Sequence, residues 1–103
     1  MAKKKGTPQS QPNPEPFVQR TAVFDDEFRE NLGWWYKTDL TKIDKIFDLV
    51  TDVMSHPFEG LGKPEPLKHL EADIWSRRID LEHRLVYRVK HNRIDFLACR
   101  YHY

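Results

Sequence analysis

The sequence predicts an α+β fold in which a hairpin of two helices packs on an antiparallel β-sheet. Three observations lead to this prediction. Residues 25–56 carry two successive amphipathic patterns with helical spacing. Residues 57–69 hold three prolines and two glycines, which is incompatible with a regular element. From residue 73 onward, β-branched and aromatic runs alternate with short polar turns, as in an antiparallel meander.

The overall composition predicts one small soluble domain. The chain has 103 residues and a net charge of +1, so its total charge indicates no particular class of partner. A single cysteine, Cys99, excludes an internal disulfide and a cysteine-based zinc site, and its apolar surroundings predict a buried side chain. No stretch approaches the roughly 18 to 20 apolar residues of a membrane span, and no apolar signal core follows the first residues. We therefore expect a cytoplasmic protein without membrane association.

Residues 1–16 are predicted to be a disordered, proline-rich tail, and residues 17–103 a single folded domain. The tail has no large apolar side chain after Met1 and holds four of the seven prolines of the chain. It can act as a solubilising extension, or Lys3, Lys4 and Lys5 can add weak, non-specific affinity for nucleic acid.

The first ordered elements are expected from Phe17 onward. Residues 17–24 have the composition of a short strand. Asp25 or Asp26 can cap a helix that ends at the turn formed by residues 37–39. The i, i+4, i+7, i+8 spacing of its apolar side chains predicts one buried stripe, made of Phe28, Leu32, Trp35 and Tyr36.

The second helix is expected to start at a cap formed by Thr38 or Asp39 and to stop before Pro57, which restricts the preceding residue and lacks an N–H group. Its predicted buried face consists of Leu40, Ile43, Phe47, Val50 and Met54.

The strand-like runs of the second half predict a sheet with an apolar side and a basic side. In residues 83–89, Leu85, Tyr87 and Val89 alternate with Arg84, Val86 and Arg88. One face can therefore pack on the helices while the other presents guanidinium groups, which suit phosphate binding beside the tyrosines at the chain end. The alternative is that these cations solvate an exposed face or pair with Glu71, Asp73 and Glu82.

Four segments of the second half carry a more specific signal. The runs "HPFEGLGKPEPLKH", "WSRRI", "EHRLVY" and "ACRYHY" resemble the YoeB/Txe toxins of the RelE superfamily, ribosome-dependent messenger-RNA endonucleases of bacterial toxin–antitoxin modules. The motifs follow in the family's order from about Pro57 to Tyr103, whereas residues 20–56 match only in their pattern of strand and helices. The resemblance implies a small microbial-ribonuclease-like α+β fold, with two helices on a twisted antiparallel sheet.

The resemblance also implies the site residues. His102 and Tyr103 match the last two residues of the family, which belong to its active site, and Glu65 and Arg84 match the other two members of that set. Lys68 and Arg78 match positions that support phosphate binding and transition-state stabilisation. His69 and His83 are adjacent to signature residues, but neither is predicted to be catalytic.

General chemistry supports these roles. Metal-free cleavage of RNA needs a base for the 2′-hydroxyl proton, an acid for the departing 5′-oxygen and cations for the charge that builds on the phosphorane. We assign Glu65 as the base, His102 as the acid and Arg84 as the cation. The product is then a 2′,3′-cyclic phosphate, and DNA, which lacks the 2′-hydroxyl, is not cut. No His, Asp and Glu cluster has the spacing of metal ligands, so we expect neither a metal nor another cofactor.

Each of these residues also has a simpler interpretation. Glu65 can pair with Lys63 or Lys68, His102 can be a frayed terminal histidine, and the arginines can be surface ion-pair partners. At the level of function, the alternative to an RNA-cleaving toxin is a non-cleaving protein that occupies the ribosome, or that acts with its antitoxin on operator DNA.

The family resemblance implies protein partners as well. The expected partner is a cognate antitoxin whose acidic C-terminal segment folds over the toxin, with operator DNA bound only through that antitoxin. We also expect a homodimer, since Trp34 beside Trp35 offers more aromatic surface than one helix stripe needs.

Overall fold

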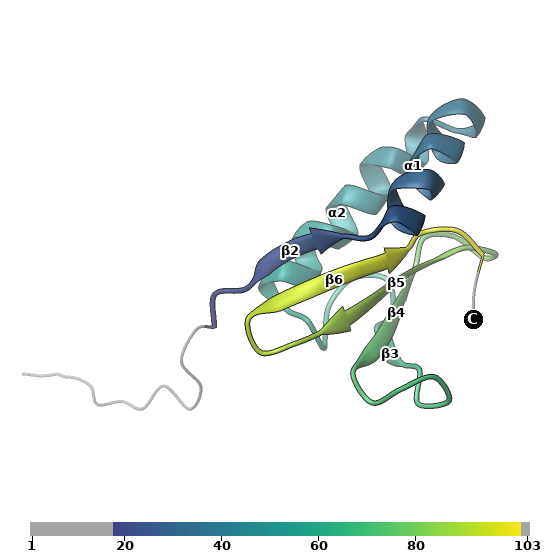
Figure 1. Cartoon of the computed structure of the whole chain (residues 1–103). Coiled ribbons are helices and arrows are strands. Elements are labelled where there is room, and N and C mark those ends of the chain that lie inside the picture. The colour runs from purple at the N-terminus through teal and green to yellow at the C-terminus, as the bar shows by residue number, and fades with distance from the viewer. Residues whose placement is uncertain (1–17, 102–103) are drawn as a thin grey trace, which may run out of the picture.

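Two helices cover one face of a five-stranded sheet in the computed structural model, which describes residues 18–101 (Figure 1). The strands are β2 (Thr21–Phe24), β3 (Glu65–Pro66), β4 (Ile74–Arg78), β5 (Arg84–Val89) and β6 (Arg93–Ala98), and the helices are α1 (Asp26–Thr38) and α2 (Thr41–Ser55). The predicted α+β architecture is thereby confirmed. The predicted tail, residues 1–16, and the site residues His102 and Tyr103 lie outside the described residues.

The sheet has the strand order β2-β6-β5-β4-β3 and is mixed rather than wholly antiparallel. The pairs β3–β4, β4–β5 and β5–β6 are antiparallel, as the meander predicted, but β2 runs parallel to β6. A parallel neighbour needs a long connection that returns the chain to the same end of the sheet. Both helices and three strands separate β2 from β6, so the chain has ample length for this crossover.

An irregularity in the β5–β6 pairing sets which way the end of the chain faces. Tyr87 lies opposite Phe96 and Val86 lies opposite Ala98, so Leu97 is an extra residue on β6. Leu97 and Ala98 consequently both belong to the open side of the sheet, and Cys99 turns back toward the helices. The bulge thus reverses the side-chain alternation just before the chain end.

Helix α1 follows the prediction closely but not completely. It begins at Asp26 with Asp25 as its N-cap residue, and Phe28 and Trp35 are buried. Leu32 packs against the same core. Tyr36 is 70% exposed, so its predicted place in the stripe is wrong. The helix presents the row through Phe28 and Trp35 to the core, and Tyr36 lies beyond the edge of that row.

Helix α2 is rotated about its axis relative to the predicted face. Its buried residues are Ile46, Leu49, Val50 and Val53, of which only Val50 was predicted. Ile43 and Met54 are partly buried, whereas Leu40 and Phe47 are 59% and 40% exposed. The helix carries two adjacent apolar rows, and the row with Ile46 and Val53 meets the sheet. The predicted row lies at the margin, where the Phe47 ring contacts Phe24 and Phe28.

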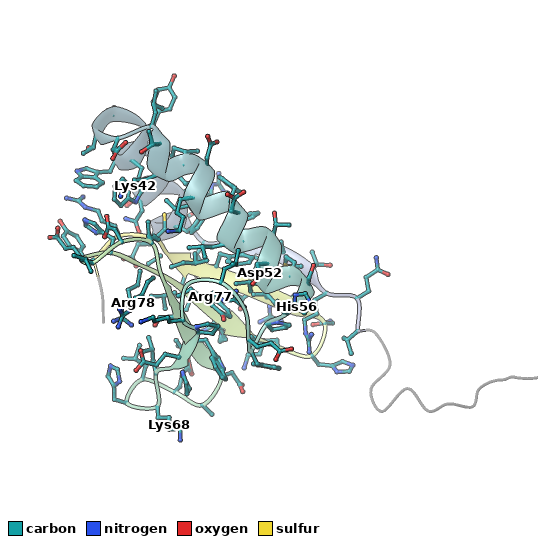
Figure 2. All side chains as sticks on the ribbon, turned by 180° about the vertical axis from the view of Figure 1, so that it is seen from behind. Lys42, Asp52, His56, Lys68, Arg77 and Arg78 are labelled. Atoms are coloured by element: carbon teal, nitrogen blue, oxygen red, sulfur yellow. The ribbon has the colours of Figure 1, made fainter. Side chains whose placement is uncertain are left out.

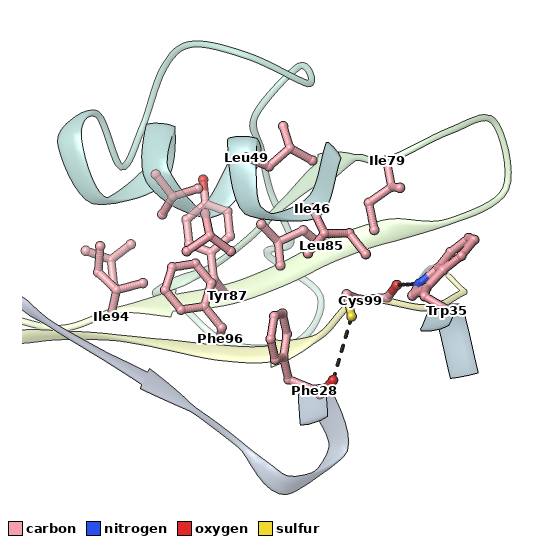
Figure 3. Packing of buried hydrophobic residues seen from close by; sticks show 13 residues of the cluster. Phe28, Trp35, Ile46, Leu49, Ile79, Leu85, Tyr87, Ile94, Phe96 and Cys99 are labelled. Atoms are coloured by element: carbon pink, nitrogen blue, oxygen red, sulfur yellow. Dashed lines mark hydrogen bonds between the residues drawn. The ribbon is translucent and has the colours of Figure 1, made fainter. Parts of the chain in front are cut away.

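The core lies between the helices and the inner face of the sheet (Figure 3). Leu85, Tyr87 and Val89 of β5 point into it, as their alternation predicted, while Val86 faces the other side. Phe24 of β2 stacks on Phe96 of β6 with ring centroids 5.3 Å apart. Cys99 is fully buried, as predicted, and burial raises the pKa of its thiol to about 12.

A buried arginine, Arg77 on β4, joins the sheet to the segment that follows α2 (Figure 2). Its Nε donates to the Tyr87 hydroxyl at 3.2 Å, and Nη1 donates to Asp52 Oδ2 at 2.5 Å and to the Leu61 carbonyl at 3.1 Å. Nη2 donates to the carbonyls of His56 and Glu59. All five N–H groups of the guanidinium are therefore used, which makes burial of the charge tolerable.

The loop that contacts Arg77 adopts a conformation that allows its close approach to the guanidinium. The Leu61 N–H and the Arg77 guanidinium hold the pKa of the Asp52 carboxyl below its usual value near 3.8. Gly60 and Gly62 have φ values of +121° and +77°, and a Cβ at Gly60 would lie 2.1 Å from Asp52 Oδ2. The glycines of this loop thus permit both its turns and its close approach to the ion pair.

Replacing Arg77 should destabilise the protein far more than replacing its neighbour Arg78. In Arg77→Met, Asp52 loses its partner and several carbonyls lose their donor, so we expect a loss of about 3–5 kcal/mol in the free energy of unfolding. Arg78 is exposed, and Arg78→Met should change that free energy by less than about 0.5 kcal/mol. Urea denaturation of both variants is the measurement, and equal stabilities would contradict the role given to Arg77.

Candidate active site

The predicted site lies on the open face of the sheet, opposite the helices. Strand alternation directs Ser76 and Arg78 of β4 and Arg84 and Arg88 of β5 to this face. Its centre holds a small apolar cluster, which consists of Leu67, Ile74, Val86 and Ala98 with Leu97 packed against it. Charged side chains flank this cluster at both ends.

At one end, Glu65 and Arg84 form an ion pair. Arg84 Nη1 donates to Glu65 Oε1 at 3.1 Å, and it lies 3.3 Å from the Ser76 hydroxyl oxygen. The two charged residues are 19 positions apart in the sequence, and strand register brings them together. Glu65 pairs with Ser76 across β3 and β4, and the adjacent strand β5 contributes Arg84. The Glu65 side chain is 60% exposed, so a bound substrate can reach it.

The Pro- and Gly-rich segment holds Glu65 at the edge of the sheet. Arg78 N–H donates to the Gly62 carbonyl at 2.6 Å, and Lys63 follows with a left-handed φ of +55°. The two residues of β3 then run beside β4, and the buried Leu67 anchors the chain beyond them. Pro66 is acceptable in this edge strand because a missing N–H there leaves no ladder bond unmade.

Arg84 also connects the site to the end of the chain. Its backbone N–H donates to the carbonyl oxygen of Tyr101 at 2.8 Å. Tyr101 is the last described residue and immediately precedes His102 in the sequence. The described part of the chain therefore ends beside Arg84.

The two predicted phosphate-binding residues are placed differently. Arg78 is the register partner of Arg84, on the adjacent strand. Lys68 lies in the loop after β3, and its side chain points away from Arg78 (Figure 2). Neither side chain makes an ion pair or hydrogen bond with another residue in 18–101. The structure thus brings together Glu65, Arg78 and Arg84, with Lys68 set apart as a second unpaired cation.

Several other cations of this face are engaged in ion pairs. Arg88 contacts Asp95 at 3.0 Å and Glu71 at 3.3 Å, and Lys90 lies 3.4 Å from Asp73. For these two residues, the simpler interpretation of the sequence as surface ion pairing is correct. Within residues 18–101, Arg78 at the other end of the face has no such ion-pair partner.

Two residues that lie beside the candidate site escaped the sequence prediction. Ser76 is fully buried and contacts Arg84, but a lone serine within a strand gives no signal of such a role. His83 is 6% exposed, and its Nδ1 accepts a hydrogen bond from the Tyr101 N–H at 2.7 Å. Its place beside Arg84 was the only hint that it lies near the site.

Within residues 18–101, no three His, Cys, Asp or Glu side chains are grouped in a way that could hold a metal ion. The same residues include no helix that is long and apolar enough to cross a membrane.

Residues 24–103 match the family described as YoeB-like toxin of bacterial type II toxin-antitoxin system. The chain is 47% identical over 81 residues to Toxin YoeB of Escherichia coli strain K12, covering 79% of this chain and 96% of that protein. It is 42% identical over 84 residues to Toxin RelK of Mycobacterium tuberculosis, covering 82% of this chain and 99% of that protein.

Solved structures agree with these sequence matches. A YoeB/ParE toxin from Agrobacterium tumefaciens superposes with a TM-score of 0.76 at 44% identity, covering 81% of this chain and 99% of that one. A YoeB dimer from Staphylococcus aureus gives 0.75 at 36% identity, covering 82% and 99%. YafQ from E. coli, at 16% identity and a TM-score of 0.64 over 81% of this chain and 93% of that one, shares the fold.

Proposed function

Because this chain belongs to the family of YoeB-like toxins of bacterial type II toxin–antitoxin systems, we propose that it is an endoribonuclease that cuts messenger RNA in the ribosomal A site. The observation that carries this proposal is the contact between Glu65 and Arg84, at 3.1 Å on an accessible sheet edge. It supplies a potential base and a phosphate-binding cation at one point. The proposed action on ribosomes places the protein in the cytoplasm.

The proposed reaction needs no metal ion. Glu65 accepts the proton of the 2′-hydroxyl, and the 2′-oxygen then attacks the adjacent phosphorus. Negative charge builds on the non-bridging oxygens, where Arg84 and Arg78 can donate hydrogen bonds. As the bond from phosphorus to the 5′-oxygen breaks, His102 donates a proton to that oxygen. The products are a 2′,3′-cyclic phosphate and a free 5′-hydroxyl. Glu65 gains one proton and His102 loses one, so the protons balance.

The ion pair at Glu65 fits this reaction because it is exposed and replaceable. An exposed pair contributes at most about 1 kcal/mol to stability, so an incoming phosphate can take over the Arg84 guanidinium at small cost. Glu65 is then released toward the 2′-hydroxyl. Lys68, on its separate loop, is proposed to hold a neighbouring phosphate of the message rather than the scissile one.

A cognate antitoxin and a second copy of the chain are the proposed protein partners. A YoeB toxin of S. aureus, 35% identical to this chain, has been solved in complex with YefM, and a relative from the same species as a dimer. Trp34 does not provide the free aromatic surface that the sequence suggested, because Arg100 covers its ring at 3.7 Å. Contact with operator DNA is proposed to occur only through the antitoxin.

Substitutions at the site should abolish cleavage without unfolding the protein. Glu65→Gln and Arg84→Ala should each lower the cleavage rate on the order of 10²-fold or more, since each removes a group that acts in the transition state. Glu71→Gln is a matched control, because Glu71 contacts Arg88 at the other end of the face with a similar side-chain exposure, 56% against 60% for Glu65.

Primer extension on a translated message is the measurement, with melting temperatures recorded in parallel. New cuts with the wild-type protein and with Glu71→Gln, and their loss in the site variants, would support the enzyme. Stalled ribosomes on uncut message would instead favour the non-cleaving binding protein.

Removal of Tyr103 should abolish or severely reduce cleavage while leaving the melting temperature nearly unchanged. We place Tyr103 against the RNA and its terminal carboxylate near His102, where a negative charge favours the protonated imidazole that a general acid needs. A bulky tag after Tyr103 should act similarly, whereas the same tag before Met1 should be harmless. Full activity of a protein ending at His102 would remove Tyr103 from the proposed site.

Light scattering of the purified chain should give a mass near twice 12.4 kDa. Addition of the cognate antitoxin should produce a larger stable complex, because folding of its acidic segment on the basic face buries surface on both partners. A monomer that persists at all concentrations would contradict the homodimer, and it would leave the proposed chemistry unaffected.

A further inference from the structure

Cys99, the first residue after β6, is held by side chains of α1 rather than by a neighbouring strand. The Cys99 N–H donates to Asn31 Oδ1 at 2.9 Å. Trp35 Nε1 donates to the Cys99 carbonyl at 2.7 Å, as Figure 3 shows. Both backbone polar groups of Cys99 are therefore bound by α1. The guanidinium of Arg100 then lies 3.7 Å from the centre of the Trp34 ring and 4.4 Å from that of Tyr101.

The backbone of Tyr101 is bound on both sides by two consecutive residues. Its N–H donates to His83 Nδ1 at 2.7 Å, and its carbonyl accepts from the Arg84 N–H at 2.8 Å. Tyr101 also has a left-handed φ of +63°, which is uncommon and costly for a bulky residue. Such a conformation persists only where its surroundings enforce it, and it often marks a functional site.

His83 is itself held rigidly. Its backbone N–H donates to Asp80 Oδ1 at 2.7 Å, and its carbonyl accepts from the Ile79 N–H at 2.9 Å. The imidazole packs edge-on against Trp35, with ring centroids 4.8 Å apart, and the His83 side chain is 8% exposed. Because a backbone N–H can only donate, Nδ1 must be unprotonated in this arrangement. Within residues 18–101, this contact is the only hydrogen bond that the Tyr101 N–H makes.

We propose that His83 is a positioning residue, which fixes the left-handed turn at Tyr101 and thereby delivers the end of the chain to the Glu65 and Arg84 pair. The inference rests on the proposed function, because it gives His102 and Tyr103 their role in cleavage. His83 touches no reacting atom in this scheme. It acts through the Tyr101 backbone, while Arg84 both closes the turn and faces the substrate.

Two substitutions separate the hydrogen bond from the packing of the ring. The side-chain oxygen of asparagine is as many bonds from Cα as Nδ1 of histidine, so His83→Asn can still accept from the Tyr101 N–H. The terminal atoms of glutamine lie one bond further out, and His83→Gln loses this acceptor. Both variants lose the same aromatic contacts with Trp34 and Trp35, so each serves as the packing control for the other.

The experiment measures cleavage of ribosome-bound message and hydrogen exchange of the Tyr101 amide in the full chain. His83→Gln should cleave on the order of 10²-fold more slowly, as expected for a displaced catalytic group, with apparent affinity for the ribosome unchanged. Its Tyr101 amide should exchange much faster than in the wild type. His83→Asn should retain most of the activity and a protected Tyr101 amide.

Equal cleavage by the two variants, or a protected Tyr101 amide in His83→Gln, would overturn the positioning role. So would an unfolded His83→Gln beside a folded His83→Asn, since the hydrogen bond would then serve folding rather than positioning. Failure of the wild-type protein to cut any message would overturn the proposed function itself, together with the role of His83. The two failures are therefore distinguishable.

Discussion

The buried guanidinium of Arg77 is the interaction on which the site depends. Carbonyl groups of the segment after α2 converge on it, and Asp52 supplies the counter-charge from the helix. This segment leads directly into β3 and so determines where Glu65 lies. Because side chains alternate along a strand, Arg77 enters the core while Arg78 reaches the open face. Of these two adjacent arginines, Arg77 therefore holds the fold together, and Arg78 is left accessible for its proposed role in binding phosphate.

Much of this fold can be predicted from the sequence because it depends on local patterns. The start of α1, the end of α2 before Pro57, the loop after α2 and the alternation in β5 follow from a cap, prolines and period-two spacing. The predicted start of α2 was wrong, because its N-cap residue is Leu40 rather than Thr38 or Asp39. The buried face of α2 was misjudged because this helix has two adjacent apolar rows, and only the packed sheet selects the row with Ile46 and Val53. The parallel pairing of β2 with β6 is likewise a property of the whole chain.

The residues of the candidate site stay a prediction, and the contacts among them could not be predicted from the sequence. Resemblance to a family indicated Glu65, Arg84, Arg78 and Lys68, yet the contact of Glu65 with Arg84 arises from register across three strands. The contacts of Ser76 with Arg84 and of His83 with Tyr101 could not be predicted either, because each depends on which residues of other elements lie nearby. The burial of Arg77 could likewise not be predicted, since a run of two arginines does not show which one faces inward.

The bulge at Leu97 has a consequence for how the chain can vary in length. Because Leu97 and Ala98 share one side of the sheet, Cys99 meets α1 and the turn at Tyr101 follows. An insertion or deletion of one residue between Phe96 and Tyr101 would exchange the two faces, whereas most point substitutions would preserve them. Whether this segment holds an odd or an even number of residues is therefore constrained more strictly than which residues it holds.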